Sequence, residues 1–312
     1  MITTAKYSIV IPIFNEEATI LELWQQLSRV IAHFDGPTET IFVNDVSTDK
    51  SLEILNHLHL KNPQIKIINL SRNFGHQAAI TAGLENAQGE AVILMDGDLQ
   101  DEPRSLPDFI KKWQEGFQVV YAVRIKRKEN IFKRNVFKIF YLIQSFLAEV
   151  STPLDSGIFS LLDRKAVSAL KNMPERNKYL SGLRAYAGFR QTGITVERNP
   201  RYSGRPRVTL GKLFKLAFDG IFSFSKVPLK IITWLGILSA ATAFILGLAG
   251  AFYKIFLHRQ FFSWAYGLTT TFFIGGVQML SLGIIGEYIG RIYDEVKQRP
   301  YYIIAEKIGF EE

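Results

Sequence analysis

Short apolar runs alternate with amphipathic stretches along the first 125 residues of the chain. The runs are rich in β-branched residues, which is typical of strands buried on both faces of a parallel sheet. They occupy residues 7–14, 38–45, 65–70, 90–98 and 118–123. Helical spacing characterises the stretches between them, which are residues 16–34, 48–60, 76–87 and a segment after Pro103. The pattern predicts an α/β fold with a mostly parallel sheet and helices on both faces.

Two long stretches near the C-terminus carry no charged residue. They are residues 231–253 and 260–286, and each exceeds the roughly 20 residues that cross a bilayer core. The alternative is a hydrophobic hairpin buried in a soluble protein, but little sequence remains to form a core around it. We therefore expect two transmembrane helices within residues 229–290. Aromatic residues near their ends suit the membrane interface, namely Trp234, Tyr253, Trp264 and Tyr288.

Basic residues flank the two spans unequally and predict their orientation. Lys254 and Arg259 lie between the spans, whereas the outer flanks carry Lys226, Lys230, Arg291, Lys297 and Arg299. Positive charge favours the cytoplasmic side, so both termini should be cytoplasmic and the chain a multi-pass protein of the inner (plasma) membrane. The chain does not open with a signal-peptide pattern. The absence of cysteine excludes disulfides and agrees with a cytosolic domain.

Two further segments predict amphipathic helices at the membrane surface. In the first, at about 129–149, basic residues alternate with aromatic and aliphatic ones, and the second lies at 209–228. The alternative is that their apolar faces pack on the soluble domain. The net charge of +8 and pI of about 9.4 would also suit nucleic acid. We expect no nucleic-acid partner, because the basic residues lie beside apolar segments and anionic lipid accounts for them.

Polar residues follow each of the first four predicted strands. Ligands of open α/β sheets bind beyond the carboxyl ends of the strands, where a nucleotide and a metal would converge. Asp96 and Asp98 follow the fourth strand, and side chains two apart on an extended segment point the same way. We therefore expect both carboxylates to share Mg²⁺ or Mn²⁺, with Gly97 allowing close approach of a ligand. A solvated turn is the alternative.

The ordered segments "IVIPIFNEE", "VNDVSTDKS", "SRNFGHQAAITAGLENAQGE" and "VILMDGDLQDEP" resemble family 2 glycosyltransferases of the GT-A fold. More narrowly they are similar to the polyprenyl-phosphate sugar transferases, which include bactoprenol glucosyl transferases and dolichol-phosphate mannose synthases. The resemblance extends from about residue 6 through both spans. It implies a cytosolic GT-A domain at residues 1–208 and a cytosolic tail at 291–312.

The resemblance also implies roles for individual residues. The nucleotide sugar would be held by Pro12, Asn15, Glu16, Asp45, Asp96 and Gln100, with Gln77 added from the polar rim after the third strand. The segments "LDSGIFSLLDR" and "RYSGRPRV" would supply Asp155 at the reaction centre and phosphate-binding Arg201 and Arg207. Arg124 and Arg134 join them as candidates for the acceptor phosphate. The catalytic candidates are Asp155, Asp98 and Arg124.

Three departures from the family pattern limit this transfer of roles. Val46 stands where glycine is usual, so we expect the loop after Asp45 to avoid positive φ. Pro206, Arg207 and Val208 replace Ser-Lys-Tyr, and Ile158 removes a second polar group from the loop of Asp155.

The expected reaction is inverting transfer of one sugar to undecaprenyl phosphate. A phosphate monoester has a second pKa of roughly 6, so the acceptor is already largely ionised at neutral pH. Asp155 is therefore expected to support the metal and the sugar more than to act as a base. UDP-glucose is the first expectation for the donor and GDP-mannose the second. A processive glycan synthase and a catalytically silent scaffold remain alternatives, and small residues on the first span favour a homo-oligomer.

Overall fold

The computed structural model describes residues 5–124, 156–173, 175, 178, 180–196, 227–256 and 264–310. The chain divides into two compact units, and each is considered by itself. The first contains residues 1–145, 150–209 and 299–312, and the second contains residues 146–149 and 210–298. The C-terminal segment beyond residue 298 thus belongs to the first unit, although both apolar stretches precede it in sequence.

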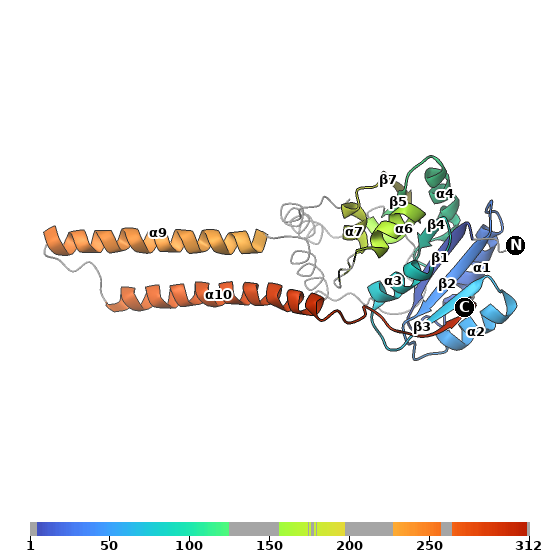
Figure 1. Cartoon of the computed structure of the whole chain (residues 1–312), viewed down its shortest axis with the longest axis horizontal. Helices are drawn as coiled ribbons and strands as arrows, with labels where there is room; N and C mark the ends of the chain where they lie inside the picture. Colours follow the sequence, from blue (N-terminus) through green and yellow to red (C-terminus); the bar gives the residue numbers. More distant parts are fainter. Residues whose placement is uncertain are drawn as a thin grey trace. The chain divides into compact units, whose positions relative to one another are not determined.

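The first unit contains an eight-stranded mixed sheet in the order β7-β5-β6-β4-β1-β2-β3-β8 (Figure 1). Strands β1, β2, β3 and β4 run parallel to one another, and β6 and β8 are antiparallel to their neighbours. The expected α/β fold is confirmed. The strands are β1 (Tyr7–Ile13), β2 (Thr38–Asn44), β3 (Ile65–Leu70), β4 (Ala91–Leu94), β5 (Val119–Arg124), β6 (Ser156–Asp163), β7 (Gln191–Val196) and β8 (Ile304–Ile308).

Helices cover both faces of the sheet, as the apolar runs predicted. Helices α1, α2 and α4 pack on one face around a core that includes Ile9, Phe42 and Phe109 (Figure 1). Helices α3, α6 and α7 lie on the other face. Their bounds are α1 (Ile20–Ile31), α2 (Ser51–Lys61), α3 (His76–Asn86), the short 3₁₀ helix η1 (Pro103–Ser105), α4 (Leu106–Gln114), α6 (Arg164–Lys171) and α7 (Leu180–Tyr186).

Helix α3 packs closely on the sheet because its buried positions are small. A methyl group added at Gly83 would lie 2.2 Å from Cγ1 of Val10 and 3.0 Å from Cγ2 of Val43. Such distances are far below an ordinary carbon contact, so only glycine fits between helix and sheet there. The close packing holds the second half of α3 against β1 and β2.

The second unit contains the helices α9 (Val227–Phe256) and α10 (Trp264–Val296). The segment Val227–Ala249 has a mean hydropathy of 2.1 and Thr270–Val296 has 1.5, and neither is buried within the protein. Each is long and apolar enough to cross a bilayer. The amphipathic segment expected at 129–149 lies outside the described residues, as does all of the one expected at 209–228 except its last two residues, which begin α9.

Candidate functional site

Six of the eight described strands, β1 to β5 and β7, end at one edge of the sheet. Because β1, β2, β3 and β4 are parallel, their carboxyl ends meet there, and the antiparallel β6 begins at the same edge. Val123 of β5 pairs with Ser156 of β6, which brings the carboxyl end of β5 to this edge as well. We call this edge the carboxyl rim, and all the described candidate residues lie on it or next to it in sequence.

Backbone hydrogen bonds join the loops that follow β1 and β2. The backbone N–H of Asn15 donates to Oγ of Ser47 (3.0 Å), and the backbone N–H of Thr48 donates to Oδ1 of Asn15 (2.7 Å). The backbone N–H of Glu16 donates to Oγ of Ser51 at 2.9 Å. Asn15 has a φ of 55°, in the left-handed region, which asparagine tolerates better than most residues. The structure thus brings Asn15 and Glu16 to the loop after β2.

The carboxylate of Asp45 holds the loop between β3 and α3. Its two oxygens accept hydrogen bonds from the backbone N–H groups of Phe74 (2.7 Å) and Gly75 (2.9 Å). Asp45 is 2 % exposed. Burial raises the pKa of this carboxyl above its ordinary value, although the two backbone hydrogen bonds act to lower it. The shape of the loop therefore depends on Asp45, whatever else it binds.

The expectation that Val46 avoids positive φ is wrong. Val46 has a φ of 58°, a left-handed conformation that is a strong outlier for a β-branched residue. Its flanking groups are fixed on both sides and hold it there. The backbone N–H of Asp45 donates to the carbonyl of Ile13 (2.9 Å), and that of Ser47 donates to Oδ1 of Asn44 (3.1 Å). The surrounding hydrogen bonds thus override the preference of the side chain.

Asp96 and Asp98 lie in a turn and not on an extended strand. Strand β4 ends at Leu94, short of the expected end at residue 98, so the alternation of side chains along a strand does not apply to this pair. The turn closes through a hydrogen bond from the backbone N–H of Gln100 to Oδ1 of Asp98 (3.1 Å) and through Leu99, whose φ is 60°. This hydrogen bond places the backbone of Gln100 beside Asp98 at the carboxyl rim.

Gly97 lies against the end of β1. An added methyl group there would lie 2.7 Å from Cδ1 of Ile13 and 3.2 Å from the carbonyl oxygen of Pro12. The carbonyl oxygen of Gly97 is 3.0 Å from Oγ1 of the buried Thr19, which precedes α1. Pro12, expected to bind the nucleotide, is buried within β1. A residue without a side chain at position 97 therefore lets the turn lie close to β1 and to the start of α1.

Asp96 is paired with a residue that the sequence analysis left outside the site set. Nε2 of His76 lies 2.9 Å from Oδ1 of Asp96. Desolvation acts to lower the pKa of His76, but the hydrogen bond to Asp96 and the charges of Asp96, Asp98 and Asp45 raise it overall. His76 begins α3, directly beyond the loop held by Asp45. Its neighbour Gln77 has a buried Oε1 without a hydrogen-bond partner among the described residues.

The chemistry of the rim suits a divalent cation that also binds phosphate oxygens. Among the described residues no group of three or more His, Asp or Glu side chains is arranged to hold a metal. Asp96 and Asp98 offer hard carboxylate oxygens, and Mg²⁺ commonly takes one or two carboxylates together with substrate phosphates. These two carboxylates therefore fit a cation that completes its coordination with oxygens of a diphosphate and of water.

Several of the candidates for the acceptor phosphate and the reaction centre lie outside the described residues. Arg124 ends β5, where its backbone pairs with Val196 of β7, but its side chain is not described. Arg184 of α7 was missed by the sequence analysis: it is buried, donates to the carbonyl of Gly157 (3.4 Å) and lies over the ring of Tyr121. No sequence signal distinguishes it from other helical arginines. The candidates outside the described residues are Asp155, Arg134, Arg201 and Arg207.

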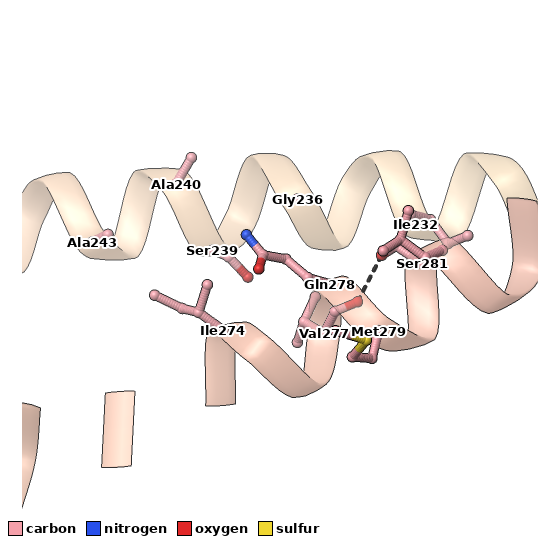
Figure 2. Close-up of a pocket in the computed structure, with 11 residues that line it drawn as sticks. Ile232, Gly236, Ser239, Ala240, Ala243, Ile274, Val277, Gln278, Met279 and Ser281 are labelled. Atoms are coloured by element: carbon pink, nitrogen blue, oxygen red, sulfur yellow. Dashed lines mark hydrogen bonds between the residues drawn. The ribbon is translucent and has the colours of Figure 1, made fainter. Parts of the chain in front are cut away.

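Helices α9 and α10 of the second unit line an open cavity of about 590 Å³. Figure 2 shows Gln278 pointing from α10 toward α9, near Ser239 and Gly236. The small residues Gly236 and Ala240, on which the expected oligomer partly rested, line this cavity. The oligomeric state stays a prediction.

Comparison with known proteins identifies the family. Residues 8–171 match glycosyl transferase family 2. The chain belongs to this family. It is 43% identical over 307 residues to "Uncharacterized glycosyltransferase YkcC" of Bacillus subtilis (strain 168), covering 98% of this chain and 95% of that one. It is 36% identical over 300 residues to "Prophage bactoprenol glucosyl transferase homolog" of Escherichia coli (strain K12), covering 96% and 98%.

Among solved structures, glucosyl-3-phosphoglycerate synthase from Mycobacterium tuberculosis, in complex with Mn²⁺, UDP-glucose and phosphoglyceric acid, is 19% identical to this chain. The match covers 70% of this chain and 79% of that one, with a TM-score of 0.47. The family 2 assignment and the two apolar helices make this chain a membrane-associated glycosyltransferase.

Proposed function

We propose that this glycosyltransferase moves one monosaccharide from a nucleotide sugar to a polyprenyl phosphate, with inversion at the anomeric carbon. Undecaprenyl phosphate is the acceptor in this proposal, and UDP-glucose is the first donor to test. The observation that carries it is similarity to proteins named bactoprenol glucosyl transferase over nearly their whole length. One of these, from Shigella phage SfV, is 35% identical over 97% of this chain and 99% of its own.

The carboxyl rim is the proposed donor site. Asn15, Glu16 and Asp45 would bind the nucleoside together with Pro12, and Gln77 and Gln100 would bind farther along the nucleotide sugar. The buried Oε1 of Gln77, which has no partner among the described residues, supports a polar ligand at this position.

Asp96 and Asp98 would hold Mg²⁺ or Mn²⁺, which would neutralise negative charge on the departing diphosphate. His76 lies 2.9 Å from Asp96 and would orient that carboxylate. Asp98 is 8 % exposed, and its Oδ1 accepts the backbone N–H of Gln100. Loss of Asp98 would therefore remove a metal ligand and a hydrogen bond of the turn, whereas loss of Asp96 would remove a metal ligand and the contact with His76.

The acceptor side needs cations more than a base, because most of a phosphate monoester is already ionised at neutral pH. Arg124, Arg134, Arg201 and Arg207 would orient this phosphate and offset its repulsion from the donor diphosphate. Asp155, which directly precedes β6, would support the sugar and the metal.

The two apolar helices would cross the membrane with both termini in the cytoplasm. The glycosyltransferase unit is then on the cytoplasmic face, where nucleotide sugars are available. This topology rests on the excess of basic residues outside the spans. A reporter fused to the segment between α9 and α10 should be accessible only from the opposite side of the membrane.

The test uses the purified full-length protein, Mg²⁺ or Mn²⁺, undecaprenyl phosphate and a panel of labelled nucleotide sugars. We expect label to enter the organic phase as a single sugar on lipid, with UDP-glucose as the best donor. Label in a water-soluble polymer would indicate a glycan synthase instead. Donor binding without transfer to any lipid phosphate would reject the proposed reaction.

A further inference from the structure

The strand that follows the second apolar helix returns to the sheet of the glycosyltransferase unit. Residues 297–303 join α10 to β8, and β8 pairs antiparallel with β3. The pairing continues upstream, where the backbone N–H of Ser71 donates to the carbonyl of Ile303 at 2.9 Å. Upstream of β8, the hydroxyl of Tyr302 donates to Oε2 of Glu85 on α3. The segment after α10 is therefore bound to the unit at two places.

Three side chains in direct register connect β8 to β2. Asn44 of β2 lies opposite Asn69 of β3, which in turn lies opposite Glu306 of β8. Nδ2 of Asn69 donates to Oε2 of Glu306 (2.9 Å), and Nδ2 of Asn44 donates to Oδ1 of Asn69 (3.3 Å). Asn44 and Asn69 are only 3 % and 7 % exposed. We call this row the amide ladder.

The amide ladder has a direction that the carboxylate of Glu306 at one end and the backbone N–H of Ser47 at the other both require. A carboxylate accepts hydrogen bonds and donates none, whereas an asparagine amide can point either way. Glu306 therefore requires the NH₂ group of Asn69 to face it, and this turns the oxygen of Asn69 toward Asn44. The NH₂ group of Asn44 must then face Asn69, so Oδ1 of Asn44 is left to accept from the backbone N–H of Ser47 (3.1 Å).

The end of the amide ladder lies in the loop that contains the left-handed Val46. Ser47 accepts the backbone N–H of Asn15 on its Oγ, and thus connects the ladder to the loop after β1. A β-branched residue with a φ of 58° persists only where its surroundings hold it, since the left-handed conformation is unfavourable for a branched side chain. Reversal of the Asn44 amide would place a donor against the N–H of Ser47 and remove one of these restraints.

We propose that Glu306 is a positioning residue for the donor site, acting through Asn69 and Asn44 on residues 45–48. The inference rests on the proposed function in that these residues belong to the proposed nucleotide site. The carboxylate of Glu306 would act on the nucleotide sugar only indirectly, because Asn69 and Asn44 lie between it and residues 45–48. The segment that follows the second apolar helix thereby completes the site formed by the N-terminal half of the chain.

The experiment compares the full-length protein with three variants, Glu306→Ala, Glu306→Gln and Lys307→Ala. Glutamine retains an oxygen that can accept from Asn69, whereas alanine removes the acceptor. Lys307 is the matched control, because it is the next residue of β8, is exposed and takes no part in the ladder. The measurements are amide hydrogen exchange of residues 44–48, binding of UDP, donor KM and kcat for lipid glycosylation, and the melting temperature.

We expect Glu306→Ala to speed exchange at residues 45–48 and to raise the UDP dissociation constant and donor KM about tenfold, with kcat changed less than about twofold. Glu306→Gln and Lys307→Ala should stay within about twofold of the wild type in every measurement. Equal exchange and equal donor KM in Glu306→Ala and Lys307→Ala would overturn the proposal. So would a fall in kcat without a change in KM.

The hydrogen-exchange comparison keeps this proposal separable from the proposed function. A wild-type protein that binds UDP but transfers no sugar would reject the reaction, while exchange and UDP binding would still test the ladder. If Glu306→Ala lowers the melting temperature strongly, Glu306→Gln provides the second test. Failure of glutamine to restore protection at residues 45–48 would show that the acceptor oxygen is not what matters.

Discussion

Replacing Gly97 with alanine should damage transfer far more than it damages the fold. The added methyl group would lie 2.7 Å from Cδ1 of Ile13 and 3.2 Å from the carbonyl oxygen of Pro12. Ile13 is fully buried, and the carbonyl of Pro12 is backbone in a central strand. The terminal methyl of Ile13 has little room to move within the core and the carbonyl of Pro12 cannot move without β1, so we expect the turn that carries Asp96 and Asp98 to move.

The size of the effect follows from this geometry. Contacts at ordinary van der Waals distance begin at about 3.4 Å, so the turn must move by several tenths of an ångström. Overpacking of this kind typically costs about 1–3 kcal/mol of stability. Misplacement of reacting groups by about 1 Å can lower activity about 100-fold. We therefore expect kcat/KM for lipid glycosylation to fall about 100-fold, with unfolding free energy lowered by about 1–3 kcal/mol.

Gly83→Ala is the matched control for this substitution. Its methyl group would lie 2.2 Å from Cγ1 of Val10, so it overpacks the same strand, but from α3 and away from the turn. Both variants are to be compared by thermal unfolding and by label transferred to lipid. Equal losses of activity at equal losses of stability would refute the claim that Gly97 acts through the position of Asp96 and Asp98.

Three further predictions follow from the described contacts. Glu39→Ala should lower the unfolding free energy by about 3–5 kcal/mol, because Glu39 is buried 2.8 Å from Lys66 and its loss leaves the Lys66 ammonium without this partner. Chemical denaturation measures this loss, and the KM for the sugar donor should not change. Asp45→Asn should cost about 1–3 kcal/mol and speed amide exchange at residues 74 and 75, because an NH₂ group would face one backbone N–H. Asp98→Asn, or chelation of divalent cations, should lower transfer at least about 100-fold, and transfer that is unchanged in EDTA would contradict a metal role.

The first half of the fold was predictable because its strands are buried on both faces. The apolar runs at residues 7–14, 38–45, 65–70 and 118–123 differ by at most one residue at either end from β1, β2, β3 and β5. Burial on both faces requires continuous apolar sequence, and that signal is local. The helices between them were predictable for the same reason, since a single face of each packs on the sheet.

Strand β8 was not predictable from its own residues. Its sequence, Ile304 to Ile308, has only two large apolar side chains, and it follows a helix long enough to span a membrane. What makes it a strand is the free edge of β3, which lies more than 200 residues earlier in the chain. An edge strand forms because it pairs with a neighbouring strand, and that neighbour cannot be identified from a single sequence.

The turn of Asp96 and Asp98 shows where sequence reasoning fails at the site itself. The apolar run continues to Met95, which led to a strand through residue 98, yet β4 stops at Leu94. Beyond this residue the chain is held by tertiary contacts, including those of Gly97 with β1 and with Thr19. The two carboxylates could be proposed as site residues from the sequence, but the conformation of their turn depends on contacts with residues about 80 positions away.

Backbone strain is concentrated where the proposed chemistry lies. Of the four described non-glycine residues with positive φ, Asn15, Val46 and Leu99 follow β1, β2 and β4 at the carboxyl rim. A valine in this conformation is unfavourable, and it is retained here by hydrogen bonds that the backbone N–H groups of Asp45 and Ser47 donate to Ile13 and Asn44. The sequence rule that valine avoids positive φ describes an isolated residue. It fails here because hydrogen bonds to neighbouring residues determine the shape of this loop, and variants of Glu306 are expected to weaken one of them.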